Sequence, residues 1–374
     1  MNPRDNALDA INHKQPHHVP VSIGSTIVDG LTKYAKAAYE QHCGVPAAGE
    51  EITHIAMQTV ATPEWIKNDI GMPFETIRMK GPFLDNTRFE ADGSYTDEFG
   101  IYWKKCELYN DPVRGPLFGS ITEDDIRKNP WADASDKGRV RGLRDEALAI
   151  RARGDKVVVA DIMCGGPFEQ SLWMRGWDDF LCDMCVDKKL AEALLDRITE
   201  NDIALWDAYL TEVGDLVDIV CQGDDLGMQD RSIISAELYR EMVFKYHKRL
   251  YDFIKSKTKA KIFMHSCGSV YDLLPDLIEA GVDILNPVQI AAKNMEPEKL
   301  KSDFGDALCF WGGIDTQYVL PHGSRQEIKD LVKRLVDVLG KDGGYVLAPG
   351  HNIQNYVEPW RIQAMIGAMK KSQL

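Results

Sequence analysis

The sequence lacks any apolar run long enough to cross a bilayer, and it lacks an excess of positive charge. Its 374 residues include 44 Lys and Arg against 58 Asp and Glu, a formal net charge of −14. An acidic chain repels phosphate backbones and anionic lipids, so we expect neither nucleic acid nor a membrane as a partner. Residues 1–15 are polar and mixed in charge, which is unlike a signal peptide.

Two phosphate-binding motifs are missing as well. None of the expected strands is followed by the three spaced glycines of a dinucleotide-binding turn, and the sequence contains no P-loop. Eight cysteines are spread over the full length without the framework of a small disulfide-rich domain. These absences argue against a Rossmann-type nucleotide enzyme and favour a reducing, cytoplasmic compartment.

What the sequence does contain is a regular alternation of apolar runs and helix-like stretches from residue 140 onwards. Six apolar runs have the character of buried strands, each followed by polar residues: 157–162, 217–221, 261–265, 282–285, 308–311 and 345–348. Repeated strand–helix units predict an α/β fold with a parallel sheet closed as a (β/α)8 TIM barrel, preceded by N-terminal helices. An open, doubly wound sheet is the alternative.

The segment before this alternation contains one departure from it. Residues 88–95 predict a β-hairpin around the Asp92-Gly93 turn, which interrupts the strand–helix pattern. We therefore expect a hairpin insertion at about 85–106 within a single domain that spans residues 1–374. Upstream, a helix is expected over 33–42, with Asp29 as its cap and Gly44 at its end.

His265 and Cys267 end one of the predicted strands, and Gly268 lets the backbone turn after them. Side chains at i and i+2 share one face of an extended chain, and imidazole and thiolate are ligands that zinc prefers. A buried cysteine beside a hydrogen-bonded histidine would give the same pattern. A catalytic zinc takes three protein ligands and leaves a fourth position for substrate. His351, at the tip of the last strand, is the leading third ligand; Cys309 or a carboxylate is the alternative.

Other polar and aromatic side chains also fall at the expected strand ends. In α/β barrels the carboxyl ends of the strands open onto the active site. The candidate substrate-binding residues at this rim are Asp224, Asn286, Gln289, Trp311 and Asn352. Asp225 and Asp315 lie at the same rim, although a single Asp after a strand commonly caps the next helix.

Taken together, these residues resemble the uroporphyrinogen decarboxylase superfamily. Within it, the chain is most similar to the methyltransferases that feed methyl groups to corrinoid proteins, such as the first methyltransferase of O-demethylases. The resembling segments cover almost the whole chain: 4–21, 92–100, 223–227, 265–268, 280–289, 312–315 and 348–354. Their order and spacing make the resemblance specific, whereas any one of them alone would not.

The resemblance implies a barrel in which His265 and Cys267 hold Zn2+. It also implies a corrinoid (cobalamin) cofactor supplied by a partner protein, because the chain has no corrinoid-binding signature of its own. Residues 22–26 lack the arginines of a true decarboxylase, and His351 stands where the thiol-directed branch has a cysteine. We therefore expect a methyltransferase that moves a methyl group from a small methylated substrate, with aryl methyl ethers favoured, to a cob(I)amide.

In this reaction a bound zinc would act as a Lewis acid on the substrate heteroatom, and Asp225 or Asp315 would deliver a proton to the departing oxygen. Three alternatives stay open. The first is a cofactor-free decarboxylase, for which Arg78, Arg175 and Arg231 are the available carboxylate clamps. The second is a methyltransferase from a methylcorrinoid to a thiol or tetrahydrofolate, and the third is a non-catalytic metal- or corrinoid-binding protein. The oligomeric state is also open, with a homodimer as one option.

Overall fold

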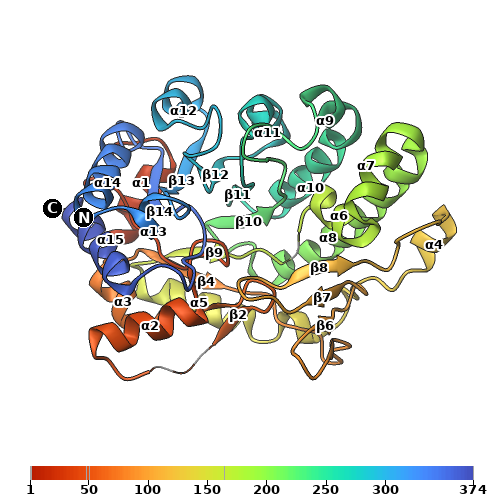
Figure 1. Ribbon diagram of the computed structural model, residues 1–374, viewed down its shortest axis with the longest axis horizontal. Helices are drawn as coiled ribbons and strands as arrows, with labels where there is room; N and C mark the ends of the chain where they lie inside the picture. The colour runs from red at the N-terminus through yellow and green to blue at the C-terminus, as the bar shows by residue number, and fades with distance from the viewer. Residues whose placement is uncertain (1, 48, 50, 164, 374) are drawn as a thin grey trace.

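The computed structural model describes residues 2–47, 49, 51–163 and 165–373. Within these ranges, seven parallel strands form a curled sheet in the order β14-β13-β12-β11-β10-β9-β4 (Figure 1). Their bounds are β4 (Phe74–Ile77), β9 (Val157–Ala160), β10 (Ile219–Gly223), β11 (Lys261–His265), β12 (Ile284–Asn286), β13 (Cys309–Ile314) and β14 (Tyr345–Pro349). Val21 forms a parallel bridge to Leu347, which places the segment around Val21 beside β14 at the eighth position of the barrel.

The central strands are apolar because both faces of the sheet are covered. Every residue of β9, β10, β13 and β14 is buried, as is typical of parallel strands with helices on the outside. The predicted (β/α)8 architecture is confirmed. Strand β13 differs from the expectation, because it continues through Gly312 and Gly313 to Ile314 instead of ending at Trp311.

Helices surround the outer face of the sheet (Figure 1). Those of the barrel are α5 (Leu143–Arg153), α6 (Pro167–Arg175), α7 (Trp177–Val186), α8 (Lys188–Val213), α9 (Ala236–Met242), α10 (Phe244–Lys257), α11 (Leu274–Ala280), α12 (Pro297–Phe304), α13 (Val319–His322), α14 (Arg325–Leu339) and α15 (Pro359–Lys371). In α14 the buried side chains recur every three or four residues and face β13 and β14. A reciprocal capping box between Ser324 and Glu327 begins this helix.

The N-terminal region adds helices and a small antiparallel sheet. Its elements are α1 (Pro3–Ile11), β1 (Leu31–Thr32), α2 (Lys33–Cys43), β2 (Ile52–His54), β3 (Thr59–Val60) and α3 (Glu64–Asp69). Helix α2 ends at Gly44, whose φ of 67° suits glycine, as predicted. The prediction that Asp29 caps this helix is wrong, because Thr32 accepts the hydrogen bond from the N–H of Ala35. Asp29 is instead fully buried and accepts hydrogen bonds from Ser22 and Thr26.

The predicted hairpin insertion is present and is larger than expected. It is a four-stranded antiparallel sheet of β5 (Arg88–Phe89), β6 (Tyr95–Thr96), β7 (Tyr102–Lys104) and β8 (Asp111–Arg114), followed by α4 (Glu123–Lys128). The turn between β5 and β6 is closed by Gly93 at a φ of 89°. The insertion packs on the barrel through Trp103, whose ring centroid lies 5.4 Å from that of Trp173 in α6. Among the described helices, none is both long and apolar enough to cross a membrane.

Candidate metal centre and substrate chambers

Three predicted metal ligands come together at the carboxyl ends of the strands. His265 is the last residue of β11, Cys267 follows it by two residues, and His351 follows β14. Their ligand atoms all lie within 4.8 Å of one another. The Sγ atom of Cys267 is 3.3 Å from Nε2 of His265, and the two imidazole centroids are 5.3 Å apart. One imidazole, one thiol and a second imidazole form a donor set that suits zinc.

Asn286 holds the first of these ligands in place. Its Oδ1 atom lies 2.5 Å from Nδ1 of His265, and its Nδ2 donates to the carbonyl oxygen of Trp311 at 3.0 Å. Asn286 is fully buried, so its predicted role in substrate binding is replaced by one in orienting His265. A partner on the second ring nitrogen is a regular feature of metal-binding histidines.

His351 is oriented by two groups on its Nδ1 atom. The backbone N–H of Asn352 donates to Nδ1 at 2.8 Å, and the Tyr109 hydroxyl lies 2.9 Å away. Burial and the neighbouring His265 lower the pKa of His351 to about 3, so the ring is neutral at physiological pH. Asn352 is buried, and its side chain bonds to the backbone of Gly30 and Ile27. It also lines a cavity beside His351, so its role in substrate binding stays a prediction.

The loop that carries Cys267 is fixed from two sides. Asp225 accepts the N–H of Cys267 at 2.8 Å, and the same oxygen lies 3.8 Å from Nε2 of His265. Gln289 accepts the N–H of Gly268 at 2.8 Å and donates to Gln229. Both predicted residues therefore lie beside the metal ligands, and both are partly exposed.

Asp224 points away from the site, in contrast to its neighbour Asp225. It is fully buried, accepts the N–H groups of Phe168 and Glu169 at 2.9 and 2.7 Å, and lies 2.7 Å from Nε2 of His247. These three partners hold the carboxylate inside the protein, and Asp224 lines neither of the cavities beside the candidate ligands, so the prediction that it binds substrate is corrected. Asp224 instead caps the first turn of α6 and thereby positions Glu169.

Glu169 is a candidate functional residue that the sequence did not single out. Glu169 lies in the first turn of α6, which follows the loop after β9, so it lies near the carboxyl end of a strand like the predicted residues. Burial, followed by the charges of Asp225 and Asp224, raises the pKa of Glu169 well above its ordinary value. Glu169 and Asp225 line the same cavity. The position of Glu169 soon after a predicted strand is the sequence signal that could have identified it.

Two further predictions are settled by position in the barrel. Trp311 is fully buried in the barrel interior, packed against Phe74 and Phe263, and its indole N–H donates to Asp29 at 3.0 Å. It therefore forms core and not a substrate wall. Cys309 begins β13, is fully buried, and is absent from the group of candidate ligands, which removes it as the third ligand.

Two chambers meet at the metal centre. The larger, of about 530 Å3, is lined by His265, His351, Asp225 and Glu169 together with the inner side of the insertion. The smaller, of about 280 Å3, is lined by Cys267, Gln289, Asp315 and again His351. The candidate ligands thus face two separate spaces, one on each side of His351 and Tyr109.

The larger chamber has aromatic walls and an acidic lining. Its aromatic residues are Tyr95, Phe99, Trp103, Tyr109 and Trp173. Its acidic residues are Asp97, Glu98, Asp111, Glu169 and Asp225. Among the described residues that line it, there is neither a lysine nor an arginine.

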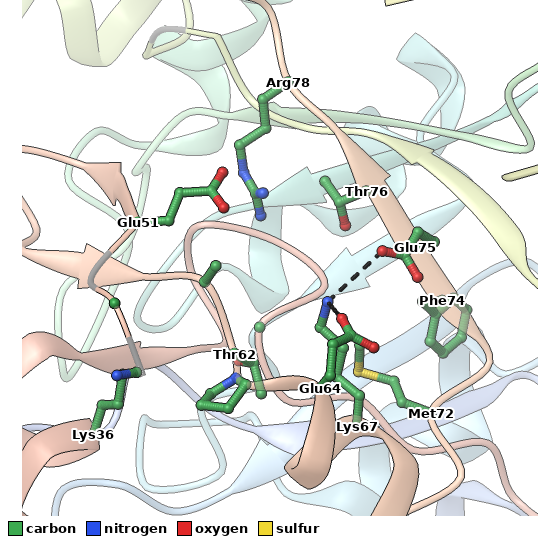
Figure 2. A pocket seen from close by; sticks show the side chains of 14 residues that line it. Lys36, Glu51, Thr62, Glu64, Lys67, Met72, Phe74, Glu75, Thr76 and Arg78 are labelled. Atoms are coloured by element: carbon green, nitrogen blue, oxygen red, sulfur yellow. Dashed lines mark hydrogen bonds and ion pairs between the residues drawn. The ribbon is translucent and has the colours of Figure 1, made fainter. Parts of the chain in front are cut away.

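The arginines that a decarboxylase would use lie elsewhere. Arg175 is held by Asp183 and by backbone carbonyls, and Arg231 is exposed beside Asp230. Arg78 bonds to Asp161 at 3.0 Å and lines a third cavity of about 390 Å3. Figure 2 shows its guanidinium and the carboxylate of Glu51 pointing toward one another across that cavity, which does not contain the metal ligands.

Comparisons with known proteins identify a family and several relatives that the sequence resembles. Residues 105–372 match the family model described as Uroporphyrinogen decarboxylase (URO-D). The chain is 24% identical over 268 residues to a methylated-thiol–coenzyme M methyltransferase from Methanosarcina mazei, which covers 68% of this chain and 65% of that relative. It is 23% identical over 275 residues to a uroporphyrinogen decarboxylase from Alcanivorax borkumensis, covering 70% and 73% of the two chains. The chain therefore spans slightly less than two thirds of the length of the first relative.

A solved structure supports the fold over the full length. It is described as a methyltransferase from Methanosarcina mazei, and it superposes with a TM-score of 0.67 at 16% sequence identity over 99% of both chains.

Proposed function

Because the chain belongs to the uroporphyrinogen decarboxylase family, we propose that it is a zinc-dependent methyltransferase linked to a corrinoid protein. In this proposal, the methyl donor is a small methoxy-aromatic compound and the acceptor is the cob(I)amide of a separate corrinoid protein. The observation that carries it is the set of His265, Cys267 and His351 placed between an aromatic chamber and a second opening.

The residues present fit a zinc ion. Burial and the charges of Asp225 and Glu169 raise the pKa of Cys267 well above its ordinary value in the protein without metal. A thiolate in this acidic surrounding requires a nearby cation, and the described lining of the larger chamber offers no basic side chain. A zinc ion bound by these three ligands would supply a Lewis acid that stabilises the negative charge on the departing substrate oxygen.

The two chambers suit two reactants. A displacement at a methyl carbon needs the nucleophile and the leaving group on opposite sides of that carbon. We assign the methoxyarene to the larger chamber, where aromatic side chains can pack on its ring. We assign the approach of the corrinoid to the smaller chamber, at whose rim Leu108 and Tyr356 are 40% and 50% exposed.

In this proposal, the acids Glu169 and Asp225 of the larger chamber deliver the proton. Burial and the charges of Asp225 and Asp224 raise the pKa of Glu169 well above its ordinary value, which favours the protonated carboxylic acid, and Asp225 lies next to it. This pair can pass a proton to the phenolic oxygen as the carbon–oxygen bond breaks. Asp315 faces the smaller chamber, and its Oδ1 atom accepts the N–H groups of Gln317 and Tyr318. Of the two acids predicted from the sequence, we therefore give the role to Asp225.

A second candidate is methyl transfer that involves a thiol. It is favoured by the relative from Methanosarcina mazei, whose name describes a methylated-thiol–coenzyme M methyltransferase. The decarboxylase alternative loses support, because Arg78, Arg175 and Arg231 are absent from the larger chamber. A substrate with several carboxylates would find no cationic partner there.

The test offers zinc-loaded protein a panel of methoxyarenes, methylamines and methyl thioethers, with free cob(I)alamin as acceptor under anaerobic conditions. The visible spectrum reports methylcobalamin. Methyl transfer from a methoxyarene supports the proposal, and transfer from thioethers alone supports the second candidate. Loss of activity in Cys267→Ala, with activity kept in Cys309→Ala, would tie the reaction to this metal centre.

A further inference from the structure

The side chains that line the larger chamber are acidic and aromatic, and they determine which charge a ligand can carry there. We infer that the methyl donor carries no negative charge, and that the chamber favours methoxyarenes with an ammonium substituent over methoxybenzoates. This inference rests on the proposed function, because it concerns the substrate of the same site. It is drawn from the lining of the chamber and not from the metal centre.

Three acids of the insertion, Asp97, Glu98 and Asp111, line the chamber. Asp97 closes a turn of the insertion through the N–H groups of Phe99 and Ile101, and its other oxygen accepts the indole N–H of Trp103. Asp111 is exposed on β8 and lines the same wall. Glu98 also lines the chamber, and its partner is Arg139.

Arg139 is already paired with Glu98 and does not line the chamber itself. Its side chain is 5% exposed, lies behind Glu98 and also bonds to the carbonyl oxygen of Asp133. The carboxylate of an incoming ligand would therefore find Arg139 already paired with Glu98, and it would meet Asp111 without a cation to pair with.

His54, which also lines the chamber, does not supply that charge either. Burial lowers the pKa of His54 to about 4, so its ring is neutral at pH 7. His54 is fixed by the N–H of Met57, which donates to Nδ1 at 3.2 Å. Away from the metal centre, an anionic substituent on this wall would lose its hydration without gaining an ion pair, which is costly.

The aromatic walls add an attraction for cations. The rings of Tyr95 and Trp103 stack with centroids 6.1 Å apart at an angle of 11°, and Trp173 meets Trp103 edge-on at 5.4 Å. Aromatic faces carry negative charge density that attracts ammonium groups. Acidic side chains and aromatic faces together therefore favour a positively charged substituent on the arene ring.

The inference is tested by binding, which does not require methyl transfer. Zinc-loaded protein would be titrated at neutral pH with 4-methoxybenzylammonium, 4-methylanisole and 4-methoxybenzoate, with tryptophan fluorescence as the readout because Trp103 and Trp173 line the chamber. We expect the ammonium compound to bind about tenfold or more tightly than the carboxylate, with the neutral arene between them. Equal or tighter binding of 4-methoxybenzoate would overturn the inference and leave the proposed function standing. Binding of none of the three would remove methoxyarenes as donors, and the inference with them.

A variant that adds a positive charge to the chamber should reverse the preference for cationic ligands. Thr87 is half-buried and lines the chamber, so Thr87→Lys brings an ammonium group to the wall that carries the acids. This variant should bind 4-methoxybenzoate about fivefold or more tightly than the wild type. The matched control is Val186→Lys, which makes the same change in charge on the exposed end of α7 and should change nothing. Asp111→Asn should weaken binding of the ammonium compound, and unchanged affinity in both chamber variants would contradict the inference.

Discussion

Oδ1 of Asn286 lies 2.5 Å from Nδ1 of His265, and the two residues are direct partners in the register of β11 and β12. The pairing of two neighbouring strands thus builds a metal ligand and its orienting group in one step. Because Nδ1 is engaged, Nε2 is the nitrogen that faces Cys267. The barrel itself therefore determines which ring nitrogen is presented to a metal.

Removing that orienting group should weaken metal binding without removing a ligand. Asn286→Ala is expected to lower the zinc affinity about 10- to 100-fold, as is typical when the hydrogen-bond partner of a metal-binding histidine is lost. A competition titration with a chromophoric chelator measures it. Asn286→Asp keeps an acceptor for Nδ1 and serves as the control. Unchanged affinity in the alanine variant would show that Asn286 does not support a zinc ligand.

Cys267→Ala is expected to abolish stoichiometric zinc binding, because it removes the thiolate from the donor set. Cys309→Ala is the matched control, since Cys309 is a buried cysteine outside that set. Elemental analysis after dialysis gives the metal content, and circular dichroism verifies the fold. Full zinc retention in Cys267→Ala would exclude this site.

His351→Ala tests the third ligand. We expect the zinc affinity to fall about tenfold or more, in line with the loss of a coordinating or orienting group. Tyr109→Phe removes only the hydroxyl that lies 2.9 Å from Nδ1, so its effect on zinc affinity should be smaller. If His351→Ala binds zinc as well as the wild type, a carboxylate such as Asp225 becomes the better candidate.

Asp225→Asn should reduce methyl transfer about 100-fold or more, the range for removal of a group that handles protons. Asparagine can still accept the N–H of Cys267, so the zinc content should be unchanged. Asp315→Asn is the comparison, because Asp315 accepts backbone N–H groups at the smaller chamber. A larger loss in Asp315→Asn than in Asp225→Asn would reverse our assignment of the acid.

The lowered pKa of His54 predicts a pH dependence of stability. In the unfolded chain His54 takes up a proton as the pH falls through about 6.5, whereas in the folded protein it resists protonation down to about 4. Above pH 6.5 the neutral His54 therefore does not lower the free energy of unfolding. Between about pH 6.5 and 4, protonation of His54 in the unfolded chain lowers it progressively. Urea unfolding would be measured at pH 7 and at pH 5. Between these two pH values, the free energy of unfolding of His54→Asn should fall by about 1–2 kcal/mol less than that of the wild type. Equal losses in the two proteins would contradict a neutral, buried His54.

The sequence predicted the barrel, and it singled out three residues that the structure brings together as candidate metal ligands, because both follow from the position of polar residues after apolar runs. It could not predict which way neighbouring side chains point once a strand has ended. Asp224 and Asp225 are adjacent, yet the first faces His247 in the interior and the second faces the metal centre. That difference depends on the packing of α6 and α10, which pattern alone does not contain.

The misplacement of Trp311 has a different physical reason. The strand was expected to end at Trp311, before Gly312 and Gly313, but β13 runs through both glycines with φ values of 125° and 90°. A Cβ atom at Gly312 would lie 2.0 Å from the carbonyl oxygen of Pro287, so glycine is required there by the close approach of a neighbouring backbone. A glycine that allows close packing and a glycine that allows a turn look alike in a sequence.

The most direct test of the central claim follows the methyl group itself. A methoxyarene with a 13C-labelled methyl group would be incubated anaerobically with cob(I)alamin and zinc-loaded protein, and NMR would follow both products. The account predicts that label on cobalt and free phenol accumulate in equal amounts, and that both disappear in Cys267→Ala. Label that stays on the arene while the metal centre is fully loaded, or transfer that persists in Cys267→Ala, would contradict it.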